Sequence, residues 1–188
     1  MNARWFCLVP TVALCLGVSP SSASVPPGSV VLAQDSSHWQ VFASQEGRFQ
    51  VMMPEPPRTS TESVSFPGEP IALHAFAAKD SQSEYLVTYS DYPNEFIARM
   101  GEPTQFLQAV KQGFLSGIEA SEEFSSALQL EGYPALEVEY TTPEGAAGFA
   151  RFYLVNSRLY QVIATSRENA SGDFSENADR FFASFDLR

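Results

Sequence analysis

Hydrophobic and polar residues alternate in short runs along most of the chain from residue 39 onward, and turn residues separate the runs. In "RFQVMMP", for example, Phe49, Val51 and Met53 recur at every second position, which is the spacing of a strand with one buried face. The lengths of the runs and their short connections predict an antiparallel sheet. The predicted strands lie within residues 38–44, 48–54, 59–66, 71–80, 84–92, 124–130, 133–142, 148–155 and 158–166.

Several of the connections contain residues that are typical of tight turns. Gly47 is expected to make the turn in "QEG", "EG" joins the runs on either side of residues 131–132, and Asn156 in "NS" can adopt a positive φ. Arg48 follows the first turn on the outward alternation, beside Glu46. This position predicts an ion pair of these two side chains at the surface, which would contribute at most about 1 kcal/mol.

In two segments the hydrophobic period changes to that of a helix. Residues 102–118 have apolar positions three and four apart, and Pro103 suits the first helical turn. Residues 173–185 begin with Asp173 and Glu176, which are spaced as in a capping box. The hydrophobic stripe of the second segment consists of Phe174, Ala178, Phe181, Phe182 and Phe185. Because each helix needs to bury one apolar face against the sheet, the pattern predicts an α+β fold.

The first 33 residues differ in composition from the rest of the chain. Arg4 is followed by an apolar run from Trp5 to Val18 and then by a Ser-rich tract, which is the layout of a secretory signal peptide with cleavage near Ala23 or Ala33. This run is shorter than the roughly 20 residues that span a bilayer. We therefore expect an exported protein with no integral membrane segment after cleavage.

Both cysteines, Cys7 and Cys15, lie in this leader, so the processed chain is expected to contain no thiol and no disulfide. Lipidation at Cys15 is disfavoured because the bulky Leu14 precedes it. Residues 34–38 are expected to form a flexible lead-in, and residues 39–188 a single domain, for which a hydrophobic content of 44% is ample.

The chain is strongly acidic, with 22 acidic against 11 basic residues. Since Arg4 is the only charged residue of the leader, cleavage would change the formal net charge from −11 to −12. Such a protein repels phosphate backbones and anionic headgroups, so nucleic-acid and electrostatic membrane binding are disfavoured. The negative charge is compatible with binding of cationic partners or metal cations.

Residue types that support catalysis are sparse. His38 and His74 are the only histidines, and their separation matches no common metal-ligand spacing. Glu137 and Glu139 lie on one strand face with their carboxylates roughly 7 Å apart, which would suit a hydrolase with paired carboxylates. The alternative interpretation is a solvated sheet face, with Arg151 on the next strand as an ion-pair partner.

Calcium needs only oxygen ligands, and two acidic turns could supply part of a calcium site. Asp80 and Glu84 lie in the first of these turns, and Asp91 and Glu95 in the second. Neither turn has the spacing of an EF-hand loop, and both sequences are ordinary turn chemistry.

The tyrosines are candidates for recognition, because tyrosine is enriched at protein interfaces. Tyr85 and Tyr89 are expected to pack under a helix, whereas Tyr92 is a candidate for binding a partner. A carrier of a small apolar ligand is a further alternative, but bulky residues such as Phe114 and Phe181 predict a filled interior.

From residue 39 to 188 the chain resembles the secreted bacterial members of the PsbP-like family. The resemblance rests on "EGRFQVMMPEPP", "YLVTYSDYP", "GYPALEVE", "ARFYLVNSRLYQV" and "FFASF". It implies an antiparallel sheet with helices packed on both faces. It also implies a non-enzymatic accessory or binding protein in the periplasm, thylakoid lumen or extracellular space. No cofactor is expected, apart from weak binding of calcium at the acidic surface. The partner would be a protein of the envelope or lumen, for example in a photosynthetic complex.

Overall fold

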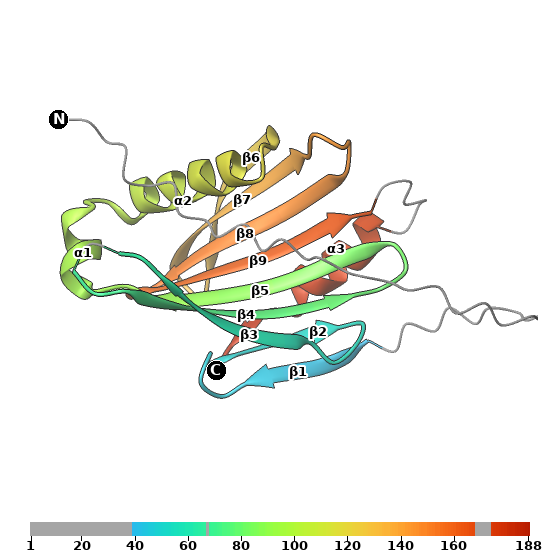
Figure 1. Cartoon of the computed structure of the whole chain (residues 1–188), viewed down its shortest axis with the longest axis horizontal. Coiled ribbons are helices and arrows are strands. Elements are labelled where there is room, and N and C mark those ends of the chain that lie inside the picture. Colours follow the sequence, from blue (N-terminus) through green and yellow to red (C-terminus); the bar gives the residue numbers. More distant parts are fainter. Residues whose placement is uncertain (1–38, 67, 168–173) are drawn as a thin grey trace, which may run out of the picture.

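The computed structural model describes residues 39–66, 68–167 and 174–188 (Figure 1). The predicted leader, the lead-in at 34–38 and Asp173 lie outside the described residues. The strands are β1 (Gln40–Ser44), β2 (Phe49–Met53), β3 (Arg58–Val64), β4 (Ile71–Lys79), β5 (Ser83–Asp91), β6 (Ser121–Leu130), β7 (Tyr133–Thr141), β8 (Ala147–Val155), β9 (Arg158–Ser166) and β10 (Asp186–Leu187). The helices are α1 (Asn94–Arg99), α2 (Pro103–Gly117) and α3 (Phe174–Ala183).

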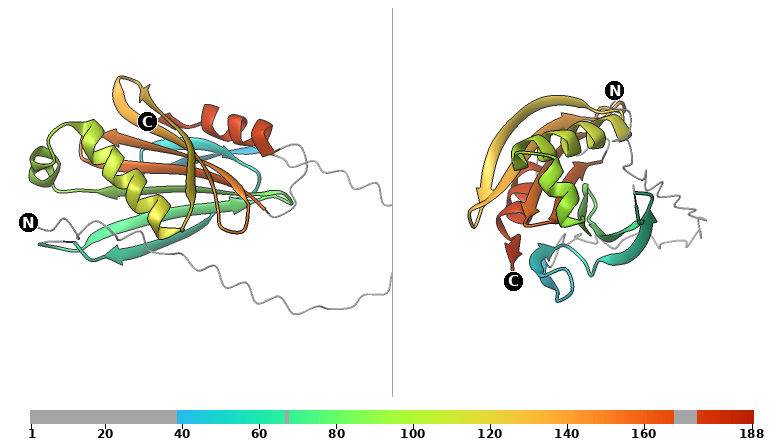
Figure 2. Two further views of the ribbon diagram at one scale, coloured as in Figure 1. Left: turned by 90° about the horizontal axis from the view of Figure 1, so that it is seen from above. Right: turned by 90° about the vertical axis from the view of Figure 1, so that its left-hand side faces the viewer.

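Seven of the strands form one antiparallel sheet in the order β3-β4-β5-β9-β8-β7-β6. All of its neighbouring strands are antiparallel, and five of its six pairings are hairpins between consecutive strands. The sheet is twisted and curved, as Figure 2 shows from one end. The α+β fold with antiparallel strands that the hydrophobic pattern predicts is therefore confirmed.

The turns of two hairpins have the backbone conformation that their sequences predict. Asn156, between β8 and β9, has a φ of 56°, and Glu131 and Gly132, between β6 and β7, have φ values of 51° and 84°. Positive φ at these positions gives the turn a twist that matches the twist of the flanking strands.

The first hairpin does not belong to the large sheet, contrary to the prediction of one sheet. β1 pairs with β2, and β2 pairs on its other side with the two-residue strand β10 at the C-terminal end of the chain. The side chains of Phe49, Val51 and Met53 in β2 are completely buried. The small sheet therefore packs against the large one with the apolar face that the alternation predicts.

Alternate residues of the shared strands contribute to two separate hydrophobic clusters. On β9, Tyr160 and Val162 pack with α3 and β2, whereas Leu159 and Ile163 pack with α2. Because neighbouring residues of a strand point to opposite faces, the clusters lie on opposite faces of the sheet. Figure 2 shows α2 and α3 on either side of the strands.

α2 and α3 agree with the helical periods of the sequence. α2 begins at Pro103 in the first turn, as predicted, and buries Phe106, Leu107 and Phe114. α3 buries Phe174, Ala178, Phe181 and Phe182. Phe185 is also buried but follows the end of α3, so it belongs to the connection to β10 and not to the helix.

The short helix α1 is not predicted by the sequence, which indicates only a turn at Asn94 and Glu95. It buries no residue completely, so its hydrophobic period is too weak to stand out. None of the helices in the described part of the chain is long and apolar enough to cross a membrane.

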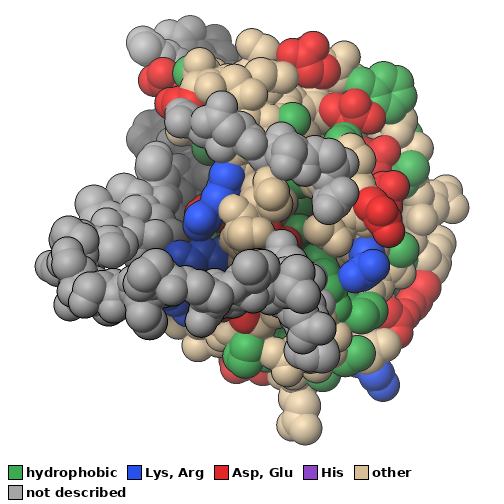
Figure 3. Space-filling model, turned by 90° about the vertical axis from the view of Figure 1, so that its right-hand side faces the viewer, with side chains coloured by type: hydrophobic (Ala, Val, Ile, Leu, Met, Phe, Trp, Pro, Cys, Tyr) green, Lys and Arg blue, Asp and Glu red, His purple; other side chains and the backbone are tan. Residues whose placement is uncertain are grey.

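Negative charge is concentrated in one part of the sequence. Residues 112–150, which include β6 and β7, contain seven glutamates and neither lysine nor arginine. In the space-filling view of one end of the molecule, acidic and hydrophobic side chains lie side by side along one side (Figure 3). The acidic composition is therefore partly a local property of the β6–β7 region.

Gly148 at the start of β8 allows the ring of Tyr140 on β7 to pack directly against the backbone. A Cβ atom at residue 148 would lie 2.1 Å from Cζ of Tyr140. The ring cannot easily move, because Tyr140 is buried and its hydroxyl is hydrogen-bonded to Oγ1 of Thr165 at 2.7 Å. The contact therefore requires glycine at residue 148.

Replacing Gly148 by alanine is expected to lower the free energy of unfolding by about 2 kcal/mol, the usual range for overpacking in a core. Urea unfolding of the purified chain measures the change. In a Tyr140→Leu background the added methyl group meets no ring, so the effect of Gly148→Ala should largely disappear. Equal losses in both backgrounds would show that the contact with Tyr140 is not the cause.

Candidate functional site

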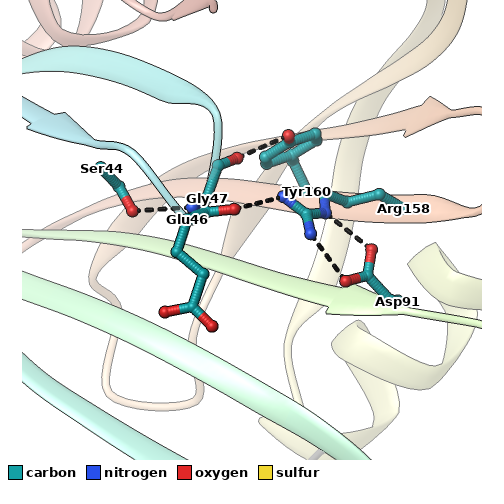
Figure 4. A network of polar contacts seen from close by, with 6 residues as sticks. All are labelled: Ser44, Glu46, Gly47, Asp91, Arg158 and Tyr160. Atoms are coloured by element: carbon teal, nitrogen blue, oxygen red, sulfur yellow. Dashed lines mark hydrogen bonds and ion pairs between the residues drawn. The ribbon is translucent and has the colours of Figure 1, made fainter.

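A network of polar contacts lies where β5 ends and β9 begins (Figure 4). The β8–β9 hairpin turn at residues 156–157 makes Arg158 the first residue of β9, and the separate pairing of β9 with β5 places it directly opposite Asp91. Both positions are strand ends, so their side chains meet at one end of the sheet. The guanidinium is thus positioned by the hairpin turn and by the long-range pairing of β9 with β5 together.

Arg158 binds both the neighbouring strand and the small sheet. Its Nε and one terminal nitrogen donate hydrogen bonds of 2.7 and 2.6 Å to the two oxygens of Asp91. Its other terminal nitrogen donates to the backbone carbonyl of Glu46 at 2.8 Å. The side chain of Arg158 is only 15% exposed, against 60% for Asp91. The guanidinium is thus mostly covered by protein, and the carboxylate is its solvent-facing side.

Aromatic rings complete the surroundings of this guanidinium. Its carbon lies 4.5 Å from the ring centroid of Tyr89, which is a cation–π contact. The ring of His74 stacks on the same tyrosine, with centroids 4.5 Å apart. The hydroxyl of Tyr160 donates a buried hydrogen bond of 2.7 Å to the carbonyl of Gly47. His74 is therefore half-buried in a stack, and its Nδ1 is also hydrogen-bonded to Thr61.

The pKa shifts of Asp91 and Arg158 follow from these contacts. The hydrogen bonds from Arg158 hold the pKa of Asp91 below its usual value, although partial burial opposes this shift. The same hydrogen bonds raise the pKa of Arg158. Burial raises the pKa of Tyr89. At neutral pH the network therefore contains one ion pair and neutral tyrosines.

The first turn differs from its prediction in two respects. The positive φ of 53° belongs to Arg48, and Gly47 is needed because a Cβ there would lie 2.7 Å from both the Phe49 ring and Oγ of Ser44. The predicted ion pair of Arg48 with Glu46 does not form in the structure. Instead, the backbone carbonyl of Glu46 accepts its hydrogen bond from Arg158.

Tyr92 follows Asp91 directly and belongs to an aromatic group at the same end of the sheet. Its ring stacks on Phe96 of α1 at 5.8 Å and meets Phe106 of α2 and Phe66 edge-on at 5.3 and 5.6 Å. Burial raises the pKa of Tyr92 to about 12. Most of this ring is thus used for packing, and its part in partner binding stays a prediction.

The other carboxylates that were candidates for calcium are spread over different contacts. Asp80 accepts hydrogen bonds from the backbone amides of residues 82 and 83 and from the hydroxyl of Tyr85. Glu84 pairs with Arg167 at 3.2 Å, and Glu95 is exposed in the first turn of α1. Within the described residues no three His, Cys, Asp or Glu side chains are grouped as metal ligands.

Glu137 and Glu139 share one strand face, and the expected cross-strand partner is present. Nε of Arg151 donates to Oε2 of Glu137 at 2.6 Å, and the guanidinium also lies 4.7 Å from the ring centroid of Phe182 in α3. Glu139 lies opposite Phe149 on β8. The carboxylate of Glu137 thus holds β7 to β8, and its partner Arg151 extends the contact to α3, which is a structural role.

The space between the sheet and α2 is filled by rings. Phe114 of α2 meets Tyr140 and Phe152 with centroid distances of 5.3 and 5.5 Å. An open groove of about 480 Å³ lies on the outer surface of α2 instead, and its lining consists of Thr104, Gln105, Gln108, Ala109 and Gln112. This lining is too polar for a carrier of an apolar ligand.

The sequence gives little indication of the importance of Arg158. In the sequence it is one cation after a turn, and its partner Asp91 is 67 residues away. The only available signal is the strand register, since a two-residue turn places the first residue of β9 at the end of the sheet where β5 also ends. Three donor groups of the guanidinium bind the protein itself. The site can therefore hold loops in place and present a surface, which suits binding more than chemistry.

No protein-family model matches the chain, and no curated protein matches it. Among solved structures, the chain is similar to the solution structure of cyanobacterial PsbP (CyanoP) from Synechocystis sp. PCC 6803. The TM-score is 0.57 at 13% sequence identity, and the match covers 90% of this chain and 100% of that chain. The fold is therefore PsbP-like, as the sequence motifs indicate.

A crystal structure of a protein of unknown function from Pseudomonas aeruginosa is also similar in part. It has 11% identity and a TM-score of 0.34, with 69% of this chain and 83% of that chain covered. This TM-score is too low to define a shared fold.

Replacing Arg158 by lysine should lower the free energy of unfolding by about 2 kcal/mol, because a lysine cannot replace the paired hydrogen bonds to Asp91 while reaching the carbonyl of Glu46. Urea unfolding measures the loss, and hydrogen exchange at the Gly47 amide should become faster. Arg167→Lys is the matched control, since its exposed pair with Glu84 is worth little. Similar losses in the two variants would contradict the special role of Arg158.

The lowered pKa of Asp91 makes part of the stability depend on pH. The contribution is present above the pKa of the unfolded state, about 4, and is lost as pH falls through the lower pKa of the folded state. Asp91→Asn should therefore be less stable than the natural chain at pH 7, and the difference should shrink towards pH 3. Urea unfolding across this range tests this expectation, with Glu95→Gln as the exposed control. A difference that stays constant with pH would contradict it.

Proposed function

We propose that this chain is an exported accessory protein that binds a protein partner and has no catalytic activity of its own. The observation that carries the proposal is the extent of the structural match, which spans the whole of the cyanobacterial PsbP chain and 90% of this one. An accessory role in a photosynthetic or envelope complex follows by analogy with that fold.

The contacts of the charged residues support binding over catalysis. Arg158 directs its donors to Asp91 and to the carbonyl of Glu46, and Arg151 binds the carboxylate of Glu137. Groups that are already paired and held in place are suited to maintaining a surface. The hydrolase alternative would need Glu137 to exchange its guanidinium partner for a substrate, which would leave Arg151 half-buried and unpaired.

The location of the protein follows from the leader. A signal peptide at residues 1–33 would direct the chain to the periplasm, the thylakoid lumen or the extracellular space. At the end of the large sheet where β5 ends and β9 begins, Asp91 and the accessible part of Tyr92 would then face a partner. The Arg158 network would keep the first turn and the end of β5 in a fixed arrangement for this contact.

Expression of the full chain with a C-terminal tag in its own host tests the proposal. We expect processing near Ala23 or Ala33, recovery in the exported fraction and one specific crosslinked protein partner under mild conditions. Mass spectrometry identifies the new N-terminus and the partner. The control is a chain with two arginines added within residues 5–18, which should remain unprocessed because the charges interrupt the apolar run of the leader.

Two results would contradict the proposal. An unprocessed chain in the cytoplasm would exclude export, and an exported chain that is always recovered as a monomer without a crosslinked partner would exclude the accessory role. A substrate turned over by the purified chain, with activity lost in Glu139→Gln, would favour the hydrolase alternative.

A further inference from the structure

The outer edge of β6 is open to the addition of a strand. β6 ends the seven-stranded sheet, so the outward N–H and C=O groups of this strand have no strand partner in the described parts of the chain. From Phe124 to Leu130 its sequence "FSSALQL" contains neither a charged residue nor proline. Edge strands are usually protected by such residues, and β3 at the opposite edge carries Arg58 and Glu62.

An exposed aromatic residue marks the start of this open stretch. The side chain of Phe124 is 52% exposed, and Val41 in β1 is the other large exposed hydrophobic residue of the described part. A register shift between Glu122 and Phe124 interrupts the pairing with β7 just before it. Phe124 lies opposite Glu139, so an apolar and an acidic side chain share one face at the edge.

The charges around this edge are negative and mostly uncompensated. Of the seven glutamates in residues 112–150, Glu122 pairs with Lys111 and Glu137 with Arg151. The other five have no ion pair with a described residue, and they are Glu119, Glu123, Glu131, Glu139 and Glu144. A partner that approaches β6 therefore meets a field that favours cations.

We propose that β6 is the docking edge for an extended partner segment in which basic and apolar residues alternate, added as an eighth strand of the sheet. This inference rests on the proposed function as a binding protein and specifies the chemistry of the partner. Main-chain hydrogen bonds along Phe124–Leu130 supply affinity, Phe124 supplies an apolar contact, and the glutamates select a basic segment. A second copy of this chain fits less well, because it would bring like charges together.

A synthetic ten-residue peptide of alternating arginine and valine, with blocked termini, is the probe. Added to the full processed chain, it should protect backbone amides of residues 124–130 from hydrogen exchange. The same peptide with glutamate in place of arginine should bind at least tenfold more weakly in calorimetry. Raising the salt concentration should weaken binding of the arginine peptide, since the attraction is between exposed charges.

Two lysine variants locate the binding edge. Phe124→Lys should lower the affinity for the arginine peptide at least tenfold. A lysine on an edge strand hinders strand addition, and its positive charge repels a basic ligand. Val41→Lys is the matched control, since it changes the other large exposed hydrophobic residue, on an edge strand of the other sheet, and it should leave binding unchanged. Equal effects of the two variants, equal binding of both peptides, or protection outside β6 would overturn the inference. A concentration-dependent dimer that Phe124→Lys disrupts would overturn it in favour of a second copy.

The same variants separate this inference from the proposed function. If the host partner crosslinks to the Phe124→Lys chain as well as to the natural chain, docking at β6 is wrong and the accessory role stands. If neither chain has a partner in the host, the accessory role is wrong, and the peptide measurements alone decide whether β6 accepts a basic strand.

Discussion

A guanidinium that is largely withdrawn from water needs its charge balanced and its donors occupied, and Arg158 meets both needs with groups from distant parts of the chain. Asp91 balances the charge from the neighbouring strand, and the carbonyl of Glu46 accepts a donor from the first turn. The small sheet is thereby fixed against the end of the large one. Arg158 thus links the first turn to the end of β5, and Asp91 leads directly into the aromatic group that begins at Tyr92.

The interior is organised around the faces of the large sheet. One face packs against α3 and β2 and the other against α2, so that every central strand is buried on both sides. Rings provide most of the contacts, and Phe185 illustrates this, since it stacks on Phe49 at 5.6 Å and on Tyr153 at 5.2 Å. Such cores leave little room for a bound molecule. The surface, and in particular its loops and edges, is then the part of the protein that is free to recognise something else.

Local periodicity predicts the strands, the hairpin turns and both long helices, because each is determined by residues close in sequence. The small sheet could not be predicted in this way, since β10 has only two residues and its partner β2 is far away along the chain. For the same reason the sequence identifies Asp91 as an acidic turn residue but not as the partner of Arg158. The pair of Glu137 with Arg151 was predictable because adjacent strands with a short connection set its register.

The pairing of β10 with β2 also has a consequence for the order of folding. The side chains of Gln50 and Asp186, which are hydrogen-bonded at 3.0 Å, are 136 residues apart, so this contact closes a loop that contains almost the whole domain. Contacts of such high sequence separation form slowly, because the entropy of loop closure is lost before they contribute. Five of the six pairings of the large sheet join consecutive strands, whereas the pairing of β10 with β2 joins segments from opposite ends of the described domain. The three-stranded sheet is therefore expected to form late in folding.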